Sequence, residues 1–287
     1  MLQPSKPGSI SMPAIGVVGL GQMAKALIKP LLQCGVLQPS ELLAIVNTTT
    51  SCQHSLKTLP KGITVYTADD PVAVKVWQTP MQLLAVKPQQ LAQVAASCPS
   101  KSLIAQEEQP LLVSILAGVC LRQLQDYFPS HACVRVVPSI TLLAGAGLTG
   151  IAWGDNIHNN HQRWALQLFQ AVGEVLELPE NQLDAFLALT SSGPAYVALV
   201  AEAMADGAVA AGLPRQLALY LAHRTLAGTA TLLQLHELHP AQLKDMVTSP
   251  AGTTAAALRH LERAGLRSAL IEAVIAAAIR SKELSVE

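Results

Sequence analysis

Two loops in the second half of the chain combine small and hydroxyl-bearing residues, and lie at residues 189–196 (LTSSGPAY) and 248–254 (TSPAGTT). Ser249 followed by a proline is typical of a helix N-cap with Pro at the first helical position, so we expect a helix to begin there. Free N–H groups at a helix start bind anions and would suit a small carboxylate. The alternative is that Ser249, Thr253 and Thr254 only cap the helix, and the residues alone favour neither interpretation.

A second set of chemically useful residues stands near the N-terminus, where Gly19-x-Gly21-x-x-Ala24 directly follows an apolar run at residues 14–18. Gly19 permits a tight turn, Gly21 lets the backbone approach a pyrophosphate, and Ala24 allows close helix packing. The N–H groups of the helix that follows would face the phosphates. The alternative is a glycine-rich turn without a ligand. The cofactor contacts that this turn predicts are Gly19, Gly21, Gln22 and Met23.

The end of the second predicted strand bears on the choice of cofactor. Sites for NAD usually place an acid there, which binds the ribose 2′-hydroxyl. This chain has Asn47 and Thr48 instead, and no acid appears before Asp69. Because an amide and hydroxyls donate to a 2′-phosphate that a carboxylate would repel, we expect NADPH, with NADH possible. Two further strand ends supply predicted cofactor contacts, which are Ala85, Val86, Lys87 and Pro88 in one loop and Ala117 and Gly118 in another.

The composition points to an oligomer. The chain has 287 residues, of which 51% are apolar and 13% charged, with 19 Lys and Arg against 19 Asp and Glu. A typical domain carries about 25% charged residues, so we expect apolar surface to be buried between subunits. Zero net charge argues against nucleic acid or an acidic membrane as partner. The charge-free run at residues 136–154 has the length of a membrane span, but its Pro and Gly content favours buried strands.

The cysteines and histidines indicate neither disulfides nor a metal. Five cysteines without a CxxC spacing are typical of reduced thiols in a cytoplasmic protein. The N-terminal residues lack the apolar segment of a signal peptide, which favours the same location. Eight histidines are scattered along the chain without partner ligands at useful spacing, so we expect no metal site.

The elements that must position these residues follow an alternating pattern. Short apolar runs separated by segments of helical periodicity predict a doubly wound α/β fold. From about residue 162 helical periodicity dominates, and residues 195–212 are apolar almost all round, which requires burial on every side. We predict a Rossmann-type dinucleotide-binding domain at residues 12–160 and an all-helical substrate and dimerisation domain at 161–287. The predicted strands are residues 14–18, 43–47, 63–66, 83–86, 111–116 and 134–137.

Together the motifs resemble those of the pyrroline-5-carboxylate reductase family. The similar blocks are IGVVGLGQMA, LLAVKP, SILAGV, VRVVPS, SSGPAY, LKDMVTSPAGTT and IRSKEL, which run nearly from end to end. The resemblance implies hydride transfer from NAD(P)H to the C=N carbon of 1-pyrroline-5-carboxylate, which gives L-proline in the last step of proline biosynthesis. It also implies a homodimer or higher homo-oligomer, with the substrate at the dimer interface.

The resemblance further assigns roles to individual residues. Backbone amides near Gly252 and Thr253, together with Ser249, would hold the substrate carboxylate. Thr254 would hydrogen-bond the ring nitrogen and supply or relay its proton, and Glu237 matches an acidic position near the substrate amine. These roles make chemical sense, because a protonated imine accepts hydride better than a neutral one. The alternative for Glu237 is a solvated acid at a helix end.

Three positions depart from the family pattern. Ser191 and Ala251 stand where family members usually have glycine, and Ser139 stands where an asparagine is common near the cofactor. An added Cβ restricts φ values above zero, so Ser191 and Ala251 narrow the backbone conformations that the two loops can adopt.

Two other functions stay open on the sequence alone. One is a related NADP-dependent imine or hydroxyacid reductase, whose site typically uses a lysine of the helical domain as acid. That alternative is weakened because no lysine lies between Lys101 and Lys244, although Lys244 is close to the second loop. The other is a non-catalytic nucleotide-sensing protein.

Overall fold

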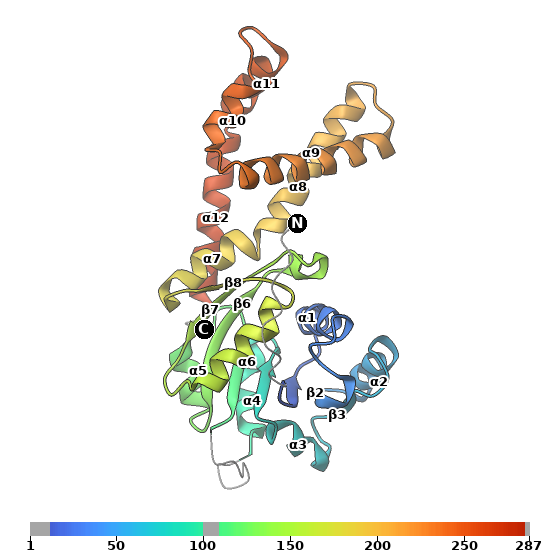
Figure 1. The fold of residues 1–287 in the computed structure, drawn as a ribbon, viewed down its shortest axis with the longest axis vertical. Helices are drawn as coiled ribbons and strands as arrows, with labels where there is room; N and C mark the ends of the chain where they lie inside the picture. Colours follow the sequence, from blue (N-terminus) through green and yellow to red (C-terminus); the bar gives the residue numbers. More distant parts are fainter. Residues whose placement is uncertain (1–11, 100–108, 285–287) are drawn as a thin grey trace. The chain divides into compact units, whose positions relative to one another are not determined.

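The computed structural model describes residues 12–99 and 109–284, which form two compact units (Figure 1). The first, named here the sheet unit, comprises Met1–Ser191 and Ala278–Glu287. The second, the helical unit, comprises Ser192–Ala277. The chain therefore leaves the sheet unit once and returns to it for its last residues.

An eight-stranded sheet with the order β3-β2-β1-β4-β5-β6-β7-β8 forms the centre of the sheet unit. The strands from β3 to β6 pair in parallel, β7 pairs antiparallel with β6, and β8 pairs in parallel with β7. The order reverses between β1 and β4, as in doubly wound dinucleotide-binding sheets, and this confirms the predicted fold class. The strands are β1 (Ile15–Val18), β2 (Leu42–Val46), β3 (Thr64–Thr67), β4 (Met81–Leu84), β5 (Leu111–Ser114), β6 (Ala132–Pro138), β7 (Gly147–Trp153) and β8 (Gly173–Glu177).

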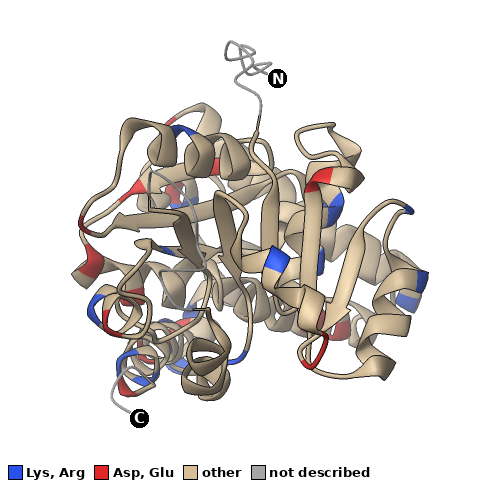
Figure 2. Cartoon of the chain, turned by 90° about the horizontal axis from the view of Figure 1, so that it is seen from below, with Lys and Arg blue, Asp and Glu red and all other residues tan. Residues whose placement is uncertain are grey.

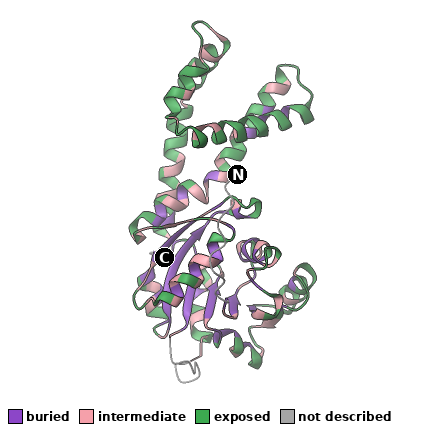
Figure 3. Ribbon diagram, viewed as in Figure 1, coloured by how far each residue is buried: buried purple, intermediate pink, exposed green. Residues whose placement is uncertain are grey.

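Helices cover both faces of this sheet. Successive strand residues alternate between two apolar cores, so that Val17 and Leu83 enter one core and Val18 and Leu84 the other. This double burial, visible as purple strands in Figure 3, is why the strands are continuous apolar runs. Short 3-10 turns (Pro39–Glu41, Pro71–Ala73, Pro88–Gln90, Ile140–Ala144 and Glu180–Gln182) link several elements. The helices are α1 (Gln22–Gln33), α2 (Thr49–Thr58), α3 (Val74–Trp77), α4 (Leu91–Ser97), α5 (Leu121–Tyr127), α6 (Asn159–Gln170) and α7 (Leu183–Thr190).

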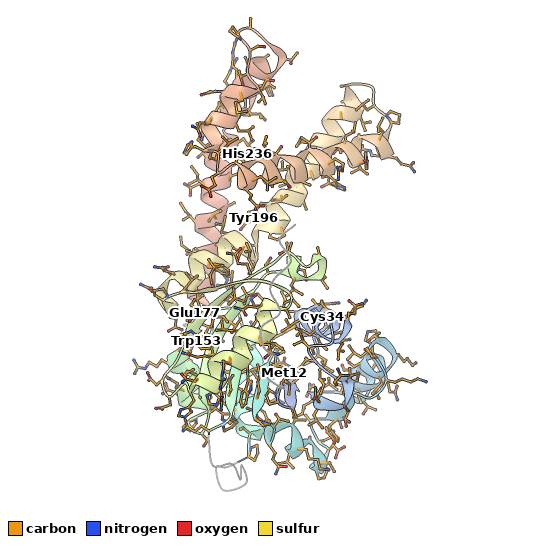
Figure 4. The ribbon with its side chains drawn as sticks, viewed as in Figure 1. Met12, Cys34, Trp153, Glu177, Tyr196 and His236 are labelled. Carbon is orange, nitrogen blue, oxygen red and sulfur yellow. The ribbon has the colours of Figure 1, made fainter. Side chains whose placement is uncertain are left out.

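The expectation that strand structure ends near residue 160 is wrong. α6, β8 and α7 all belong to the sheet unit, so the division after residue 160 falls too early, and the chain returns to that unit at residues 278–284. The reason is that β8 is an edge strand, half-exposed and carrying two glutamates, without the apolar run of a doubly buried strand. Trp153 Nε1 donates a 2.6 Å hydrogen bond to Glu177 Oε2, which adds a side-chain link between β7 and β8 (Figure 4).

The two ends of the charge-free run at residues 136–154 form buried strands, as expected, and the turn between them is largely exposed. The run supplies the end of β6, a 3-10 turn and β7, and the two strands pair as antiparallel neighbours. Among the described residues one helical stretch, Glu180–Ala210, is long and apolar enough to cross a membrane, which by itself is weak evidence. Lys and Arg lie interspersed with Asp and Glu over the described chain (Figure 2).

The helical unit has very little core of its own. Its buried apolar side chains are all alanines, namely Ala201, Ala205, Ala218 and Ala222. Most of the exposed large apolar side chains of the described chain lie in this unit, which is largely green in Figure 3. A helical unit of this composition needs further apolar burial to be stable. Its helices are α8 (Gly193–Ala210), α9 (Arg215–Leu235), α10 (Pro240–Met246), α11 (Thr253–Arg263) and α12 (Leu266–Glu283), the last of which ends in the sheet unit.

A buried imidazole predicts how stability depends on pH. His131 lies edge-on to Trp77 and Phe128, and both of its ring nitrogens are buried without a hydrogen-bond partner among the described residues. Burial lowers its pKa from 6.5 to about 4. Below pH 6.5 His131 is protonated in the unfolded chain but stays neutral in the folded protein. The contribution of the neutral His131 to the free energy of unfolding is therefore complete above pH 6.5 and is lost as the pH falls toward 4.

We expect the free energy of unfolding to fall by about 3 kcal/mol between pH 6.5 and pH 4 because of this group, at about 1.4 kcal/mol per pKa unit. Denaturant titrations at a series of pH values measure the effect. The His131→Leu variant removes the titrating group and should show a correspondingly flatter dependence. An unchanged pH dependence in that variant would contradict the assignment.

Candidate active site

A cavity of about 560 Å³ opens at the carboxyl edge of the sheet, where the loops after β1, β2, β3 and β4 meet. This edge includes the reversal in strand order between β1 and β4, which is where doubly wound sheets bind ligands. The lining includes three short runs of residues, 18–21, 45–47 and 85–87. The other lining residues are Ser51, Ala68, Asp69, Trp77, Gln90, Gln93, Val94 and Ser97.

The glycine turn between β1 and α1 forms one wall of this cavity. Gly19 has φ +93°, and a Cβ there would lie 2.9 Å from the Ala85 carbonyl oxygen, so only glycine fits. Gly21 is the N-cap of α1 and makes no side-chain cap, which leaves the first N–H groups of the helix free for phosphate oxygens. A Cβ on Gly21 would have its nearest neighbour 3.9 Å away, so the space beside it is open.

Asp69, which lies 22 positions beyond Asn47 in the sequence, joins the residues at the end of β2 in lining the cavity. Val46 pairs with Thr67 of β3, and the Ala68 N–H donates to the Val46 carbonyl oxygen at 2.9 Å. The next residue along, Asp69, therefore lies at the same edge of the sheet as Asn47, and both line the cavity. The signal was present in the alternating pattern, because a parallel neighbour of β2 must end at the same edge of the sheet.

The structure places the other predicted cofactor residues in two groups. Ala85, Val86 and Lys87 line the cavity together with Gly19, Gly21 and Asn47. The lining does not include Gln22, Met23, Thr48, Pro88, Ala117 or Gly118. Four polar lining residues had no signal in the sequence beyond helical periodicity, namely Ser51, Gln90, Gln93 and Ser97.

Two residues outside the lining have structural partners instead. The Thr48 hydroxyl caps α2 by accepting a hydrogen bond from the Ser51 N–H at 3.1 Å. Gly118 has φ +71°, and a Cβ there would lie 2.5 Å from the Cβ of Leu284, so glycine is needed for close packing against the end of α12. Asp184 on α7 ties this same end of α12 to β6, since it accepts from Ser281 at 2.7 Å and from Arg135 at 2.8 Å.

The expectation of an N-cap at Ser249 is wrong. α10 ends at Met246, and α11 begins only at Thr253 with Gly252 as its N-cap. Between them the Gly252 N–H donates to the Ser249 carbonyl oxygen at 3.0 Å, which closes a four-residue turn. Ala251 has φ +57° in this turn, a left-handed conformation that a helix starting at Ser249 excludes.

The turn still builds a helix start suited to an anion. A Cβ on Gly252 would lie 2.3 Å from Ser249 Oγ, so glycine allows this hydroxyl to approach the start of α11. No side chain caps α11, which leaves its first N–H groups available. Thr253 is exposed and Thr254 is half-buried at this end of the helix.

Glu237 also lies in strained backbone. It follows the C-cap of α9 with φ +48°, and the next N–H, of Leu238, donates to the Leu233 carbonyl oxygen at 3.2 Å. This is the pattern of a Schellman helix end, in which glycine usually holds the left-handed position. The described non-glycine residues with positive φ are Asn156, Glu237 and Ala251, so two of the three fall in candidate substrate segments, where strain is often functional.

The remaining departures from the family pattern have local partners. The Ser191 hydroxyl donates to the Pro138 carbonyl oxygen at 3.1 Å, and Ser139 caps the 3-10 turn that follows β6. Within residues 12–99 and 109–284 no three His, Cys, Asp or Glu side chains gather as a metal site. All five cysteines are free, and burial raises the pKa of Cys98 to about 11 and of Cys133 to about 12, which makes these two poor nucleophiles.

A glycine-lined cavity at the edge of a doubly wound sheet is typical of dinucleotide-binding domains. Together with the helical unit that follows the sheet in the sequence, it indicates the class of dinucleotide-dependent oxidoreductases. Residues 14–118 match the family described as NADP oxidoreductase, coenzyme F420-dependent, and residues 180–284 match the pyrroline-5-carboxylate reductase dimerisation family. The sequence is 44% identical to the pyrroline-5-carboxylate reductase of Synechocystis sp. over 94% of this chain and 97% of that protein. It is 40% identical to the one of Methanosarcina acetivorans, over 94% and 97%. The chain therefore belongs to the pyrroline-5-carboxylate reductase family.

Solved structures agree with this assignment. The crystal structure of Plasmodium falciparum pyrroline carboxylate reductase with NADP bound superposes with a TM-score of 0.85 at 24% identity, covering 96% of this chain and 100% of that one. The pyrroline-5-carboxylate reductase of Coxiella burnetii superposes with a TM-score of 0.79 at 28% identity, covering 96% and 99%. The fold is thus shared over nearly the whole chain.

Proposed function

We propose that this chain is a pyrroline-5-carboxylate reductase, which transfers hydride to the C=N carbon of 1-pyrroline-5-carboxylate and so completes the synthesis of L-proline. Family membership supports the reaction. The observation that supports the site is the uncapped start of α11, where Gly252 lets the Ser249 hydroxyl approach; this helix start would form an anion site for the substrate carboxylate.

We propose a nicotinamide dinucleotide as the hydride donor, namely NADPH, with NADH accepted as well. The start of α1 at Gly21 would hold the pyrophosphate. Asn47 and Ser51, at the end of β2 and in the first turn of α2, line the cavity and offer donors to a 2′-phosphate, which supports the use of NADPH. The predicted contacts of the β4 and β5 loops, Ala85 to Pro88 and Ala117 to Gly118, would lie toward the nicotinamide half.

The chain's own residues would bind the substrate and manage one proton. The first N–H groups of α11, beginning at Thr253 beside Gly252, and the Ser249 hydroxyl would hold the carboxylate, which orients the ring. The Thr254 hydroxyl would hydrogen-bond the ring nitrogen, and Glu237 would stabilise its positive charge. Reduction adds hydride to carbon and requires a proton on nitrogen, so a donor placed at that nitrogen lowers the barrier.

We further propose a homodimer or larger homo-oligomer that acts in the cytoplasm. The helical unit supports this assembly because its buried core is made of alanines while its large apolar side chains are exposed. A second copy is the simplest cover for such a surface. The five free cysteines are compatible with a reducing compartment.

The Thr254→Val variant tests the catalytic assignment. We expect a drop of about 100-fold in kcat/KM for 1-pyrroline-5-carboxylate, because valine keeps the shape but removes the hydroxyl that serves the ring nitrogen. The KM for the cofactor should stay within a factor of about two, since the cofactor contacts are untouched. The measurement follows NADPH and NADH oxidation by absorbance in the presence and absence of substrate.

Thr253→Val is the matched control, because the neighbouring threonine is exposed and is assigned only a backbone contact. It should retain most of the activity. Equal activity of Thr254→Val and the wild type would contradict the role of this hydroxyl. Failure of the wild type to oxidise either cofactor with this substrate would contradict the proposed function itself.

A further inference from the structure

The cavity carries a negative charge at the end where a dinucleotide places its adenosine ribose. In doubly wound sheets that ribose lies at the end of the second strand. Asn47 and Ser51 line the cavity there, and Asp69, in the loop that follows the neighbouring strand β3, lines the same cavity. The acid is thus supplied from the neighbouring strand, at the edge where NAD-binding proteins carry theirs on β2 itself.

The carboxylate of Asp69 is exposed in the cavity and ionised at neutral pH. A hydrogen bond from the Thr67 side chain is the main cause that lowers its pKa. The lining residues contain one cation, Lys87, which follows β4. Two strands, β2 and β1, separate β4 from β3 in the sheet, so no lysine or arginine lines the cavity on the side of Asp69.

This arrangement treats the two cofactors differently. A carboxylate accepts hydrogen bonds from the 2′-hydroxyl of NADH, as the acid of NAD-selective sites does. The same carboxylate repels the doubly charged 2′-phosphate of NADPH, which neutral donors such as Asn47 and Ser51 attract without adding a balancing positive charge. Asp69 and these neutral donors therefore act in opposite directions on the choice of cofactor.

We propose that Asp69 is a specificity-determining residue, which favours NADH and limits the affinity for NADPH. The inference rests on the proposed function only in that a nicotinamide dinucleotide must occupy this cavity. Removing the charge should shift the preference toward NADPH without changing the chemistry on the substrate, because Asp69 lies at the adenosine end of the site.

The test is calorimetric binding of NADP⁺ and NAD⁺ to the wild type and to Asp69→Asn, without substrate. We expect the ratio of the two dissociation constants to move about tenfold toward NADP⁺, through tighter NADP⁺ binding together with unchanged or weaker NAD⁺ binding. Added salt should shrink the difference, since the repulsion is between exposed charges.

Asp70→Asn is the matched control, one residue away and with the same change of charge. Asp70 Oδ1 accepts from the Val72 N–H at 2.8 Å, a capping bond that asparagine retains, and Asp70 is not among the residues lining this cavity. It should leave the ratio within about twofold. Equal shifts in both variants, or no shift in Asp69→Asn, would overturn the proposal.

The same variants separate this inference from the proposed function. A shifted binding ratio without reduction of 1-pyrroline-5-carboxylate would support the role of Asp69 and contradict the reaction. Reduction of that substrate with an unshifted ratio would support the reaction and contradict the role of Asp69.

Discussion

The Gly21→Val variant is expected to lose cofactor binding while keeping its fold, with the dissociation constants for NADP⁺ and NAD⁺ both raised at least about 100-fold. The reason is that Gly21 stands at the start of α1, where backbone must come close to the pyrophosphate. Its φ of −71° and ψ of −174° are open to any residue, and a Cβ would meet nothing closer than 3.9 Å. The side chain of valine would therefore occupy only the space that the phosphates need.

Gly19→Ala gives the contrast. There a Cβ would lie 2.9 Å from the Ala85 carbonyl oxygen at φ +93°, so this variant should lose both binding and thermal stability. Calorimetry with the two cofactors measures binding, and thermal unfolding measures the fold. Normal cofactor binding by a folded Gly21→Val protein would contradict the placement of the pyrophosphate at this turn.

The Ile271→Glu variant is expected to dissociate the oligomer and abolish activity together. Ile271 is 53% exposed on α12, in the helical unit whose own core consists of alanines. A symmetric dimer carries the substitution twice. Each new carboxylate would be buried in the interface at a cost of several kcal/mol, so the dissociation constant of the dimer should rise at least about a thousandfold. Because the family resemblance implies a substrate site at the dimer interface, we expect turnover to fall with the dimer.

Leu56→Glu controls for the loss of an exposed apolar side chain. Leu56 is also 53% exposed but lies on α2 of the sheet unit. Sedimentation at micromolar concentration measures the mass of each variant. We expect a monomer for Ile271→Glu and an unchanged oligomer for Leu56→Glu. A monomeric wild type, or an Ile271→Glu oligomer with full activity, would contradict assembly through the helical unit.

The sequence predicts those elements of the fold that local sequence patterns determine. The strand β1, its glycine turn and α1 are local features, because a doubly buried strand is a continuous apolar run and the turn demands glycine at φ +93°. The edge strand β8 has no such signal, since one side faces solvent and its glutamates interrupt the apolar pattern. The predicted domain division therefore falls in the first turn of α6 instead of after α7.

The sequence predicted those site residues that lie close together in the chain. It did not predict residues that strand pairing brings to the cavity from distant positions. Asp69 is 22 positions beyond Asn47 in the sequence, yet strand pairing brings the two to one edge. The Ser-Pro pair at Ser249 indicated a helix start, but the left-handed backbone at Ala251 delays that start to Thr253. Local propensity alone does not show such strain, because alanine normally avoids this conformation.

The most direct test of the central claim follows the transferred hydrogen itself. The purified protein is given 1-pyrroline-5-carboxylate and, in separate reactions, NADPH or NADH deuterated at the transferable position of the nicotinamide. The account predicts L-proline that carries one deuterium on the former imine carbon, which is the ring carbon bonded to nitrogen that does not bear the carboxylate. This product should form only when both substrate and protein are present. Cofactor oxidation without deuterated proline, or no oxidation with either cofactor, would contradict it.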